Sequence, residues 1–479
     1  MRNLYNQRAE RAWLLYTRKA TVSYSDLDQQ VQRILSDSHL WQAVEDCLAA
    51  PESEAERRLV ALVKQHLVAN AITVRPEVAW LHDRLLSVHA NTRPVVHGQS
   101  VSAGSLYRTV RSNPDRDARR AAWEALGQIS EAASADLKAY LAALNAAAAE
   151  WGYPTYYDFI LSENDSDSDF LAARLEEYRN GSDESAREVY EILEALLETA
   201  PEPWDWYYLR DAVLGEVDQY YLAERAYPSL VETLGSVGFH VDQLPVRVDA
   251  EPREDKVQGA FFFAVKSPHD VRISVNPLPG RDFYHDLYHE FGHALYLVFN
   301  ERQELIHRLD GIYFAEGLAE VIAGLINEPE WLERYTDLTP GQIARFAAYQ
   351  KLAIFDRRQN LVRVAFEMEA YRSPSGDLDC LYRSAWEKYS LLPWHDVHRW
   401  ALPVLMVSHP GHLAGSFLAN LISAQILSHL RDEGGSLFRP ATGEYLVESF
   451  YRPGRSLPWP ERLAKATGRP LSAGCALPR

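Results

Sequence analysis

The sequence has 479 residues, a formal net charge of −18 and a hydrophobic content of 47%, which is the composition of an ordinary globular protein. The negative charge argues against the binding of nucleic acid, whose phosphates require a basic surface. Three scattered cysteines, Cys47, Cys380 and Cys475, exclude a disulfide framework and a metal site built from thiolates.

The N-terminal segment is charged throughout and has no apolar core of the kind found in secretory signals. No apolar run approaches the roughly 20 residues that are needed to span a bilayer. Free thiols fit a reducing compartment. Together these features predict a cytoplasmic protein that has no membrane partner.

Helical patterns dominate the first part of the chain. Ser53 and Glu56 have the spacing of a capping box, and apolar residues follow them on one helical face. The alanine-rich segment 128–151 predicts a long helix. Helical periodicity returns in 170–178 and again in 184–197, which predicts two further helical segments.

Strand patterns are few and lie close together in the sequence. Residues 259–265 form a short apolar run, and residues 271–275 alternate between apolar and polar side chains. The residues between them, Ser267-Pro-His-Asp270, are typical of a turn. This pattern predicts a β-hairpin within a mostly helical chain.

The segment 282–298 predicts a helix that carries the motif His289-Glu-Phe-Gly-His293. The two histidines are four positions apart and project from the same helical face. They can therefore share one Zn²⁺ through ring nitrogens, and Glu290 is placed to take a proton from water bound to the metal. The alternative is a pair of partly buried histidines with a purely structural role.

A catalytic zinc needs a third protein ligand and an open position for water. Glu316 and Glu320 share one face of the otherwise apolar segment 310–325, where carboxylates are costly unless a cation compensates their charge. We expect Glu316 to bind the metal and Glu320 to accept the N–H of a ligand histidine. The alternative is a helix N-terminus whose acids face solvent. His285, one turn before His289, is expected beside the site, because a fourth protein ligand would close it.

Four segments resemble the zinc oligopeptidases of the thimet oligopeptidase and oligoendopeptidase F group, and the related peptidyl-dipeptidase A (angiotensin-converting enzyme) family. The likeness is patchy, but its segments follow the order found in the family and span residues 145–470. They are the metal motif with the Ala-Leu that follows it, the helix and turn at 145–157, the Pro-Trp-Asp element at 203–208, and the C-terminal signature at 450–459 and 466–468.

This resemblance implies a mainly α, two-lobed body around a deep channel, with a small β-sheet at the channel edge. The strands at 259–275 would bind an extended peptide there by strand addition. It also implies one zinc per chain, held by the 289–293 motif and Glu316, with Glu290 as the general base. Without a linker in the sequence, we expect a single catalytic domain over 1–479, with a mostly helical part at 1–200 and the zinc-binding part at 201–479.

In these families a late segment supplies histidine and tyrosine donors to the oxyanion of the reaction. Here that segment offers His412, and Ser416 or Phe417 stands where a tyrosine is expected. His412 is predicted to donate to the oxyanion; its alternative is a helix-start histidine without a catalytic part. The missing phenol matters because the loss of one donor costs about a hundredfold in rate. Tyr445 and Tyr451 are candidates to replace it.

The leading hypothesis is a zinc metallopeptidase that hydrolyses short, unstructured peptides. In a second hypothesis, zinc and Glu290 have the same roles, but the chain is a specialised amide hydrolase or biosynthetic enzyme that acts on one small molecule. A third is a catalytically silent binding protein, which the intact water-activating glutamate disfavours. The ligand set of two histidines and one glutamate favours zinc, although other transition metals can also bind to it.

Overall fold

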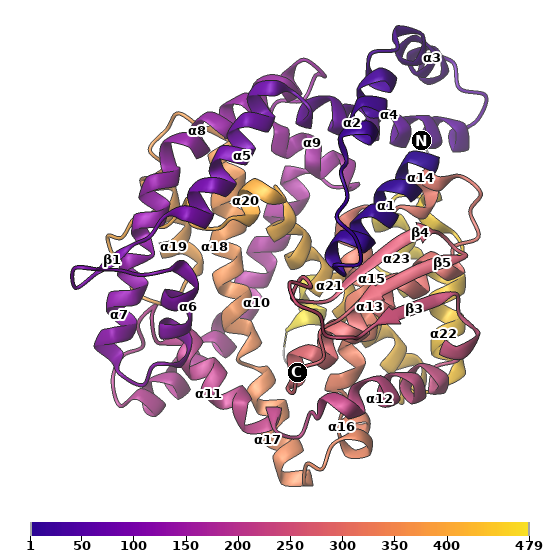
Figure 1. Cartoon of the computed structure of the whole chain (residues 1–479). Helices are drawn as coiled ribbons and strands as arrows, with labels where there is room; N and C mark the ends of the chain where they lie inside the picture. The colour runs from indigo at the N-terminus through magenta and orange to yellow at the C-terminus, as the bar shows by residue number, and fades with distance from the viewer. Residues whose placement is uncertain (1, 478–479) are drawn as a thin grey trace. The chain divides into compact units, whose positions relative to one another are not determined.

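The computed structural model describes the backbone of residues 2–477, and the side chains of these residues except 213, 214, 216 and 347–350. Helices make up most of this part of the chain, and its strands form one sheet of two strands and one of three (Figure 1). The prediction of a mainly α fold with a small β-sheet is confirmed.

The chain divides into two compact units, each built from segments that are not consecutive in sequence. Unit 1 comprises residues 1–67, 217–343 and 418–475, and unit 2 comprises residues 68–216, 344–417 and 476–479. The expected boundary between residues 200 and 201 therefore falls inside a segment of unit 2.

Unit 1 contains the three-stranded sheet and the two helices that carry the metal motif, Glu316 and Glu320. Its elements are α1 (Arg2–Tyr16), α2 (Ser25–Leu35), α3 (Ser38–Ala49), most of α4 (Glu54–Thr73), α12 (Ala223–Ser236), β3 (Val246–Asp249), β4 (Phe261–Lys266), β5 (Asp270–Ser274), α13 (Arg281–Phe299), α14 (Leu305–Arg308), α15 (Ile312–Gly324), α16 (Pro329–Tyr335), α22 (Pro440–Leu446) and α23 (Trp459–Thr467).

Unit 2 is helical apart from one small hairpin. Its elements are α5 (Pro76–Asn91), β1 (Val95–Val96), β2 (Gln99–Ser100), α6 (Ala103–Ser112), α7 (Arg116–Ala125), α8 (Gly127–Ala149), α9 (Tyr156–Glu163), α10 (Ser168–Leu197), α18 (Ala353–Arg372), α19 (Leu378–Tyr389) and α20 (Leu405–Ser408). The helices that run from one unit into the other are α4, α11 (Trp206–Asp218), α17 (Pro340–Gln350) and α21 (His412–Gly434).

The three-stranded sheet lies between two helices of unit 1. Strands β4 and β5 form the predicted antiparallel hairpin, and β3 pairs with β5 in parallel, a pairing that no sequence pattern predicted. Alternate side chains of β4 face opposite ways. Phe263 packs edge-on against Trp13 of α1, with 5.5 Å between ring centroids, and Phe262 stacks on His293 of α13 at 4.4 Å. The sheet therefore supports the metal motif directly.

Helices α13 and α15 approach each other closely at Gly292. A Cβ atom on this residue would lie 2.6 Å from the Cα of Ala319, so only glycine fits there. One turn before Gly292, α13 is also held by Tyr288, whose hydroxyl oxygen accepts a hydrogen bond from the Trp331 indole at 3.1 Å and contacts the Thr233 hydroxyl at 3.1 Å. These contacts fix the position of α13 between its neighbours.

Two of the predicted helices of unit 2 are one. Segments 170–178 and 184–197 belong to the single helix α10, which has 30 residues. The expected break fails because Gly181 remains helical, although glycine has a low helix propensity. Space beside Gly181 is short, because a Cβ atom on this residue would lie 2.4 Å from the side chain of Leu477. The long helix expected at 128–151 corresponds to α8.

The Pro-Trp-Asp element at the start of α11 has a structural role in unit 2. Asp205 is fully buried and pairs with Arg119 at 2.7 Å and with Arg116 at 2.8 Å. Its carboxylate also accepts the backbone N–H of Glu202 at 3.1 Å. Buried charges of this kind are tolerated because they are paired and hydrogen-bonded.

Within the described part of the chain, α21 alone is long and apolar enough to cross a membrane, with a mean hydropathy of 1.3 over its most apolar window. The sequence predicted no such segment, because the polar residues Asn420, Ser423 and Gln425 interrupt the apolar run. That expectation is wrong for α21. However, 78% of that window is buried, as in the core helix of a soluble protein. The cytoplasmic location stays a prediction.

Candidate metal centre

The three predicted ligands come together between α13 and α15 in unit 1. Nε2 of His289 lies 3.1 Å from Nε2 of His293. The Glu316 carboxylate lies 3.2 Å from the first nitrogen and 3.6 Å from the second. Each of the three residues offers one ligand atom, and these three atoms all lie within 4.8 Å of one another.

These distances fit a tetrahedral cation. Two nitrogens bound to one zinc at its usual bond length lie about 3.3 Å apart, and the two imidazole nitrogens are at 3.1 Å. Two unprotonated ring nitrogens would otherwise turn their lone pairs toward each other, which only a shared proton or cation relieves. The donor set of two imidazoles and one carboxylate suits zinc, and metal binding by these residues stays a prediction.

Glu320 lies behind His289, where the sequence placed it. Its Oε1 atom is 3.1 Å from Nδ1 of His289, and its Oε2 atom is 3.3 Å from Nε2 of His285. Burial raises the pKa of Glu320, but the contacts with both histidines outweigh it and lower the pKa well below its usual range. The carboxylate is therefore ionised and can orient His289 by accepting its Nδ1–H. His285 lies beside the site as a partner of Glu320.

The two ligand histidines have opposite pKa shifts. Burial lowers the pKa of His289, but the carboxylates of Glu316 and Glu320 outweigh it and raise the pKa to about 10. Burial lowers the pKa of His293 to about 4. Without a metal, His289 would therefore carry a positive charge next to Glu316 at neutral pH, and His293 would be neutral.

Glu290 is suited to proton transfer. Burial raises the pKa of its carboxyl group to about 7, with the negative charges of Glu316 and Asp286 contributing and the positive charge of His289 opposing. The backbone N–H of Phe262 on β4 donates to this carboxylate. A carboxyl group with a pKa near neutrality can both accept and return a proton at pH 7.

His412 lies in unit 2, at the first residue of α21, whereas the three donors lie in unit 1. Its backbone N–H donates to the carbonyl of His409 at 3.0 Å, which closes a tight turn with Pro410 and Gly411 at its corners. Gly411 has a φ of +76°, as the second corner of a type II turn requires. The carboxylate of Glu367 accepts the N–H of Gly411 at 3.0 Å. The turn fixes the start of the helix, and the oxyanion role of His412 stays a prediction.

The candidate replacements for the missing phenol are held by other contacts. The hydroxyl of Tyr445 donates to the carbonyl of Ala466 at 3.1 Å. Tyr451 is fully buried and packs against Phe239 and Tyr296. In the late segment Ser416 is half-buried, and Phe417 is buried with its ring 5.9 Å from that of Tyr178. Phe417 therefore has a packing role.

Two residues that shape the site were not predicted from the sequence. Phe262 contributes a ring that stacks on His293 and a backbone N–H that holds Glu290. The apolar run 259–265 predicted its strand, but no local pattern predicts which helix a strand will contact. Gly292 sets the approach of α15, and its place inside an otherwise good helix pattern was an available signal, since glycine there is costly without a packing reason.

Comparison with known proteins assigns neither a family nor a function to the chain. No protein-family model matches the chain, and no curated protein matches it.

Proposed function

We propose that the chain is a zinc-dependent metallopeptidase that hydrolyses short, unstructured peptides. The observation that carries the proposal is the convergence of His289, His293 and Glu316 on one point, with the carboxyl group of Glu290 next in sequence and its pKa raised to about 7. The resemblance of the motif segments to zinc oligopeptidases supports the same activity.

In this mechanism His289, His293 and Glu316 would hold the metal, which when bound supplies a Lewis acid for the reacting oxygens. Glu290 takes a proton from the attacking water at one carboxylate oxygen and then gives it to the nitrogen of the leaving amine. The N–H of Phe262 orients this carboxylate. Glu320 keeps His289 in the tautomer that directs Nε2 toward the metal.

The sheet offers a reason to expect an extended peptide. In the order β3-β5-β4, strand β4 stands at the edge, so one side of its backbone pairs with no strand of the described chain. An edge strand can bind an extended segment through main-chain hydrogen bonds, independently of side-chain identity. Phe262 lies on this strand and also stacks on His293, one of the proposed metal ligands, which supports peptide binding next to the metal.

The test uses the purified full chain, its zinc content and its cleavage of a mixed pool of short peptides, followed by mass spectrometry. We expect one zinc per chain and cleavage that Glu290→Gln reduces by about a thousandfold or more while zinc stays bound. Asp282→Asn, an exposed acid in the first turn of the same helix, is the matched control and should cleave like the wild type.

Two results would count against the proposal. Equal cleavage by the wild type and Glu290→Gln would exclude Glu290 as the base. Stoichiometric zinc without cleavage of any peptide would exclude a general peptidase. The alternative of an amide hydrolase for one small molecule would then be the one to pursue, with the same Glu290→Gln comparison.

A further inference from the structure

The C-terminal signature has no part in the proposed mechanism, although it lies in the same unit as the predicted metal ligands. Its aromatic residues pack against the start of α15. The centre of the Phe314 ring lies 5.9 Å from that of Trp459 and 5.7 Å from that of Phe450. Arg462, between the two parts of the signature, places its guanidinium 4.4 Å from the centre of the same Phe314 ring. The C-terminal segment therefore contacts the helix that carries Glu316.

Asp310 joins this segment to the helix of the metal motif. It directly precedes Gly311, the N-cap residue of α15, and its side chain is fully buried. One carboxylate oxygen, Oδ2, accepts hydrogen bonds from Arg462 of α23 and from the hydroxyl of Tyr296 on α13, the second at 3.1 Å. The other oxygen, Oδ1, accepts the backbone N–H of Gly311 at 3.1 Å. A single carboxylate thus connects α13, α15 and α23.

These contacts of Asp310 exceed what the start of a helix requires. Asp167 begins α10 from an exposed position, where its carboxylate accepts only the backbone N–H of Phe170 at 2.7 Å. Asp310 is instead buried beside the buried guanidinium of Arg462, and a buried pair is costly unless its geometry is well defined. Hydrogen bonds between charged groups are short and directional. The pair therefore fixes Asp310 at one place relative to α23.

Glu316 lies between two points at which α15 is fixed to α13. The first is the hydrogen bond from Tyr296 to Asp310, six residues before Glu316. The second is the close approach of α13 to Ala319, three residues after it. Tyr296 is itself three residues after His293, which places both on one side of α13. A displacement of Asp310 is therefore passed on to the carboxylate that faces the two histidines.

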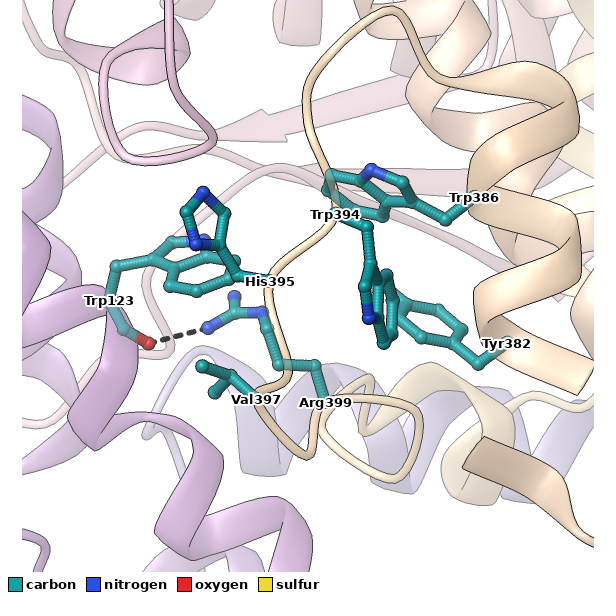
Figure 2. Close-up of a pocket in the computed structure, with 7 residues that line it drawn as sticks. All are labelled: Trp123, Tyr382, Trp386, Trp394, His395, Val397 and Arg399. Atoms are coloured by element: carbon teal, nitrogen blue, oxygen red, sulfur yellow. Dashed lines mark hydrogen bonds between the residues drawn. The ribbon is translucent and has the colours of Figure 1, made fainter. Parts of the chain in front are cut away.

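A second arginine that lies against an aromatic ring shows packing without such a connection. The guanidinium of Arg399 in unit 2 lies 4.2 Å from the centre of the Trp123 ring, and its Nη1 atom donates to the Trp123 carbonyl at 2.6 Å (Figure 2). Arg399 forms no ion pair with any residue that the structure describes. Arg462 has the same kind of aromatic contact and also a carboxylate partner that reaches α13. The additional partner distinguishes Arg462 from an arginine that only packs.

We propose that Asp310 is a positioning residue of the metal centre. Held by Arg462 and Tyr296, its carboxylate keeps the start of α15 in place, and with it Glu316, so that Glu316 shares a cation with the two histidines of α13. The C-terminal segment thereby acts on metal binding without contacting the metal. This inference rests on the proposed function for its metal site, and it assigns no contact with substrate to Asp310.

The test measures metal binding by the full chain in the absence of peptide. Zinc affinity is measured by competition with a chromophoric chelator, and cobalt(II) then replaces zinc because its visible absorption reports the number and geometry of its ligands. Tyr296→Phe removes one hydrogen bond and leaves the pair of Asp310 and Arg462 in place. We expect it to raise the zinc dissociation constant roughly tenfold. The cobalt absorption should weaken, because a displaced Glu316 leaves more positions to water.

Two matched variants separate positioning from a general loss of packing. Tyr284→Phe removes a comparable hydrogen bond, from another tyrosine of α13 to the carbonyl of Leu222 at 2.7 Å, and should keep the wild-type zinc affinity and cobalt absorption. Arg462→Lys keeps the charge beside Asp310 but loses the planar fork, and it should lower the zinc affinity. Arg399→Lys makes the same change against Trp123 and should leave the zinc affinity unchanged.

Asp310→Asn should have the largest effect, a loss of zinc affinity of roughly 10- to 100-fold. Folded Tyr296→Phe and Arg462→Lys proteins with wild-type zinc affinity and cobalt absorption would refute the role of Asp310. If Asp310→Asn does not fold, Tyr296→Phe still decides. A wild-type chain that binds neither metal would overturn this inference together with the proposed function. Weakened metal binding by the variants of a chain that cleaves no peptide would support the inference and count against the peptidase alone.

Discussion

Replacing Gly292 by alanine tests whether the approach of α13 and α15 holds the three donors together. The added Cβ would lie 2.6 Å from the Cα of Ala319 and 3.0 Å from its carbonyl oxygen. Both are backbone atoms, so no side chain can rotate aside. Ordinary contact begins at 3.4 Å, and the two helices must therefore separate by about 0.8 Å, the difference between 3.4 and 2.6 Å.

This separation acts on metal binding because the ligands are divided between the two helices. His289 and His293 belong to α13, and Glu316 belongs to α15. Metal–ligand distances tolerate only about 0.2 Å, so we expect zinc affinity to fall by roughly 10- to 100-fold. Overpacking costs about 1–3 kcal/mol, and the better helix propensity of alanine returns about 1 kcal/mol. The variant should therefore remain folded.

Zinc affinity is measured by competition with a chromophoric chelator, and folding by circular dichroism. Gly235→Ala on α12 is the matched control, because no atom lies within 4 Å of the position that its Cβ would take. It should keep the wild-type zinc affinity and gain up to ~1 kcal/mol of stability. A folded Gly292→Ala protein with unchanged zinc affinity would refute the argument that this close approach positions Glu316.

Three further predictions concern single acidic side chains. Glu320→Ala should weaken zinc binding about 10- to 100-fold, because His289 loses its orienting partner, whereas Glu316→Ala should abolish stoichiometric zinc; metal analysis after dialysis distinguishes them. Burial raises the pKa of Glu367 to about 7, so its contribution to stability is lost as pH rises from about 4.3 to about 7. Glu367→Gln should therefore melt higher than the wild type at pH 8 and nearly equally at pH 4. Asp205→Ala leaves the buried Arg119 without its partner and should cost about 3–5 kcal/mol in denaturant unfolding.

Control variants distinguish these three predicted effects from the nonspecific effects of a substitution, and for each prediction one result would contradict it. The reverse order of zinc loss would show that Glu320 is the ligand and Glu316 its support. Glu369→Gln, on the same helix as Glu367 but with 44% of its side chain exposed, should show no comparable pH effect. Glu124→Ala breaks an exposed pair with Arg120 on α7 and should cost less than about 1 kcal/mol; an equal cost for Asp205→Ala would mean that its buried pair is not needed.

Local patterns in the sequence were enough to predict the separate elements of the site. The motif at 289–293 sits on a helix whose periodicity is plain, and α13 runs from Arg281 to Phe299. The hairpin of β4 and β5 followed from an apolar run, a turn and an alternating run. Glu316 and Glu320 were expected on one face of a helix, and α15 carries both. These features depend on residues within a few positions of one another, where backbone geometry fixes which side chains share a face.

Which elements meet could be learned only from the folded chain. Strand β3 pairs in parallel with β5 across a long connection, and parallel pairing leaves no turn signal in the sequence. The contact of Phe262 with His293 joins a strand to a helix far along the chain. Such contacts depend on how elements pack, and the periodicity of a segment carries no information about its distant partner.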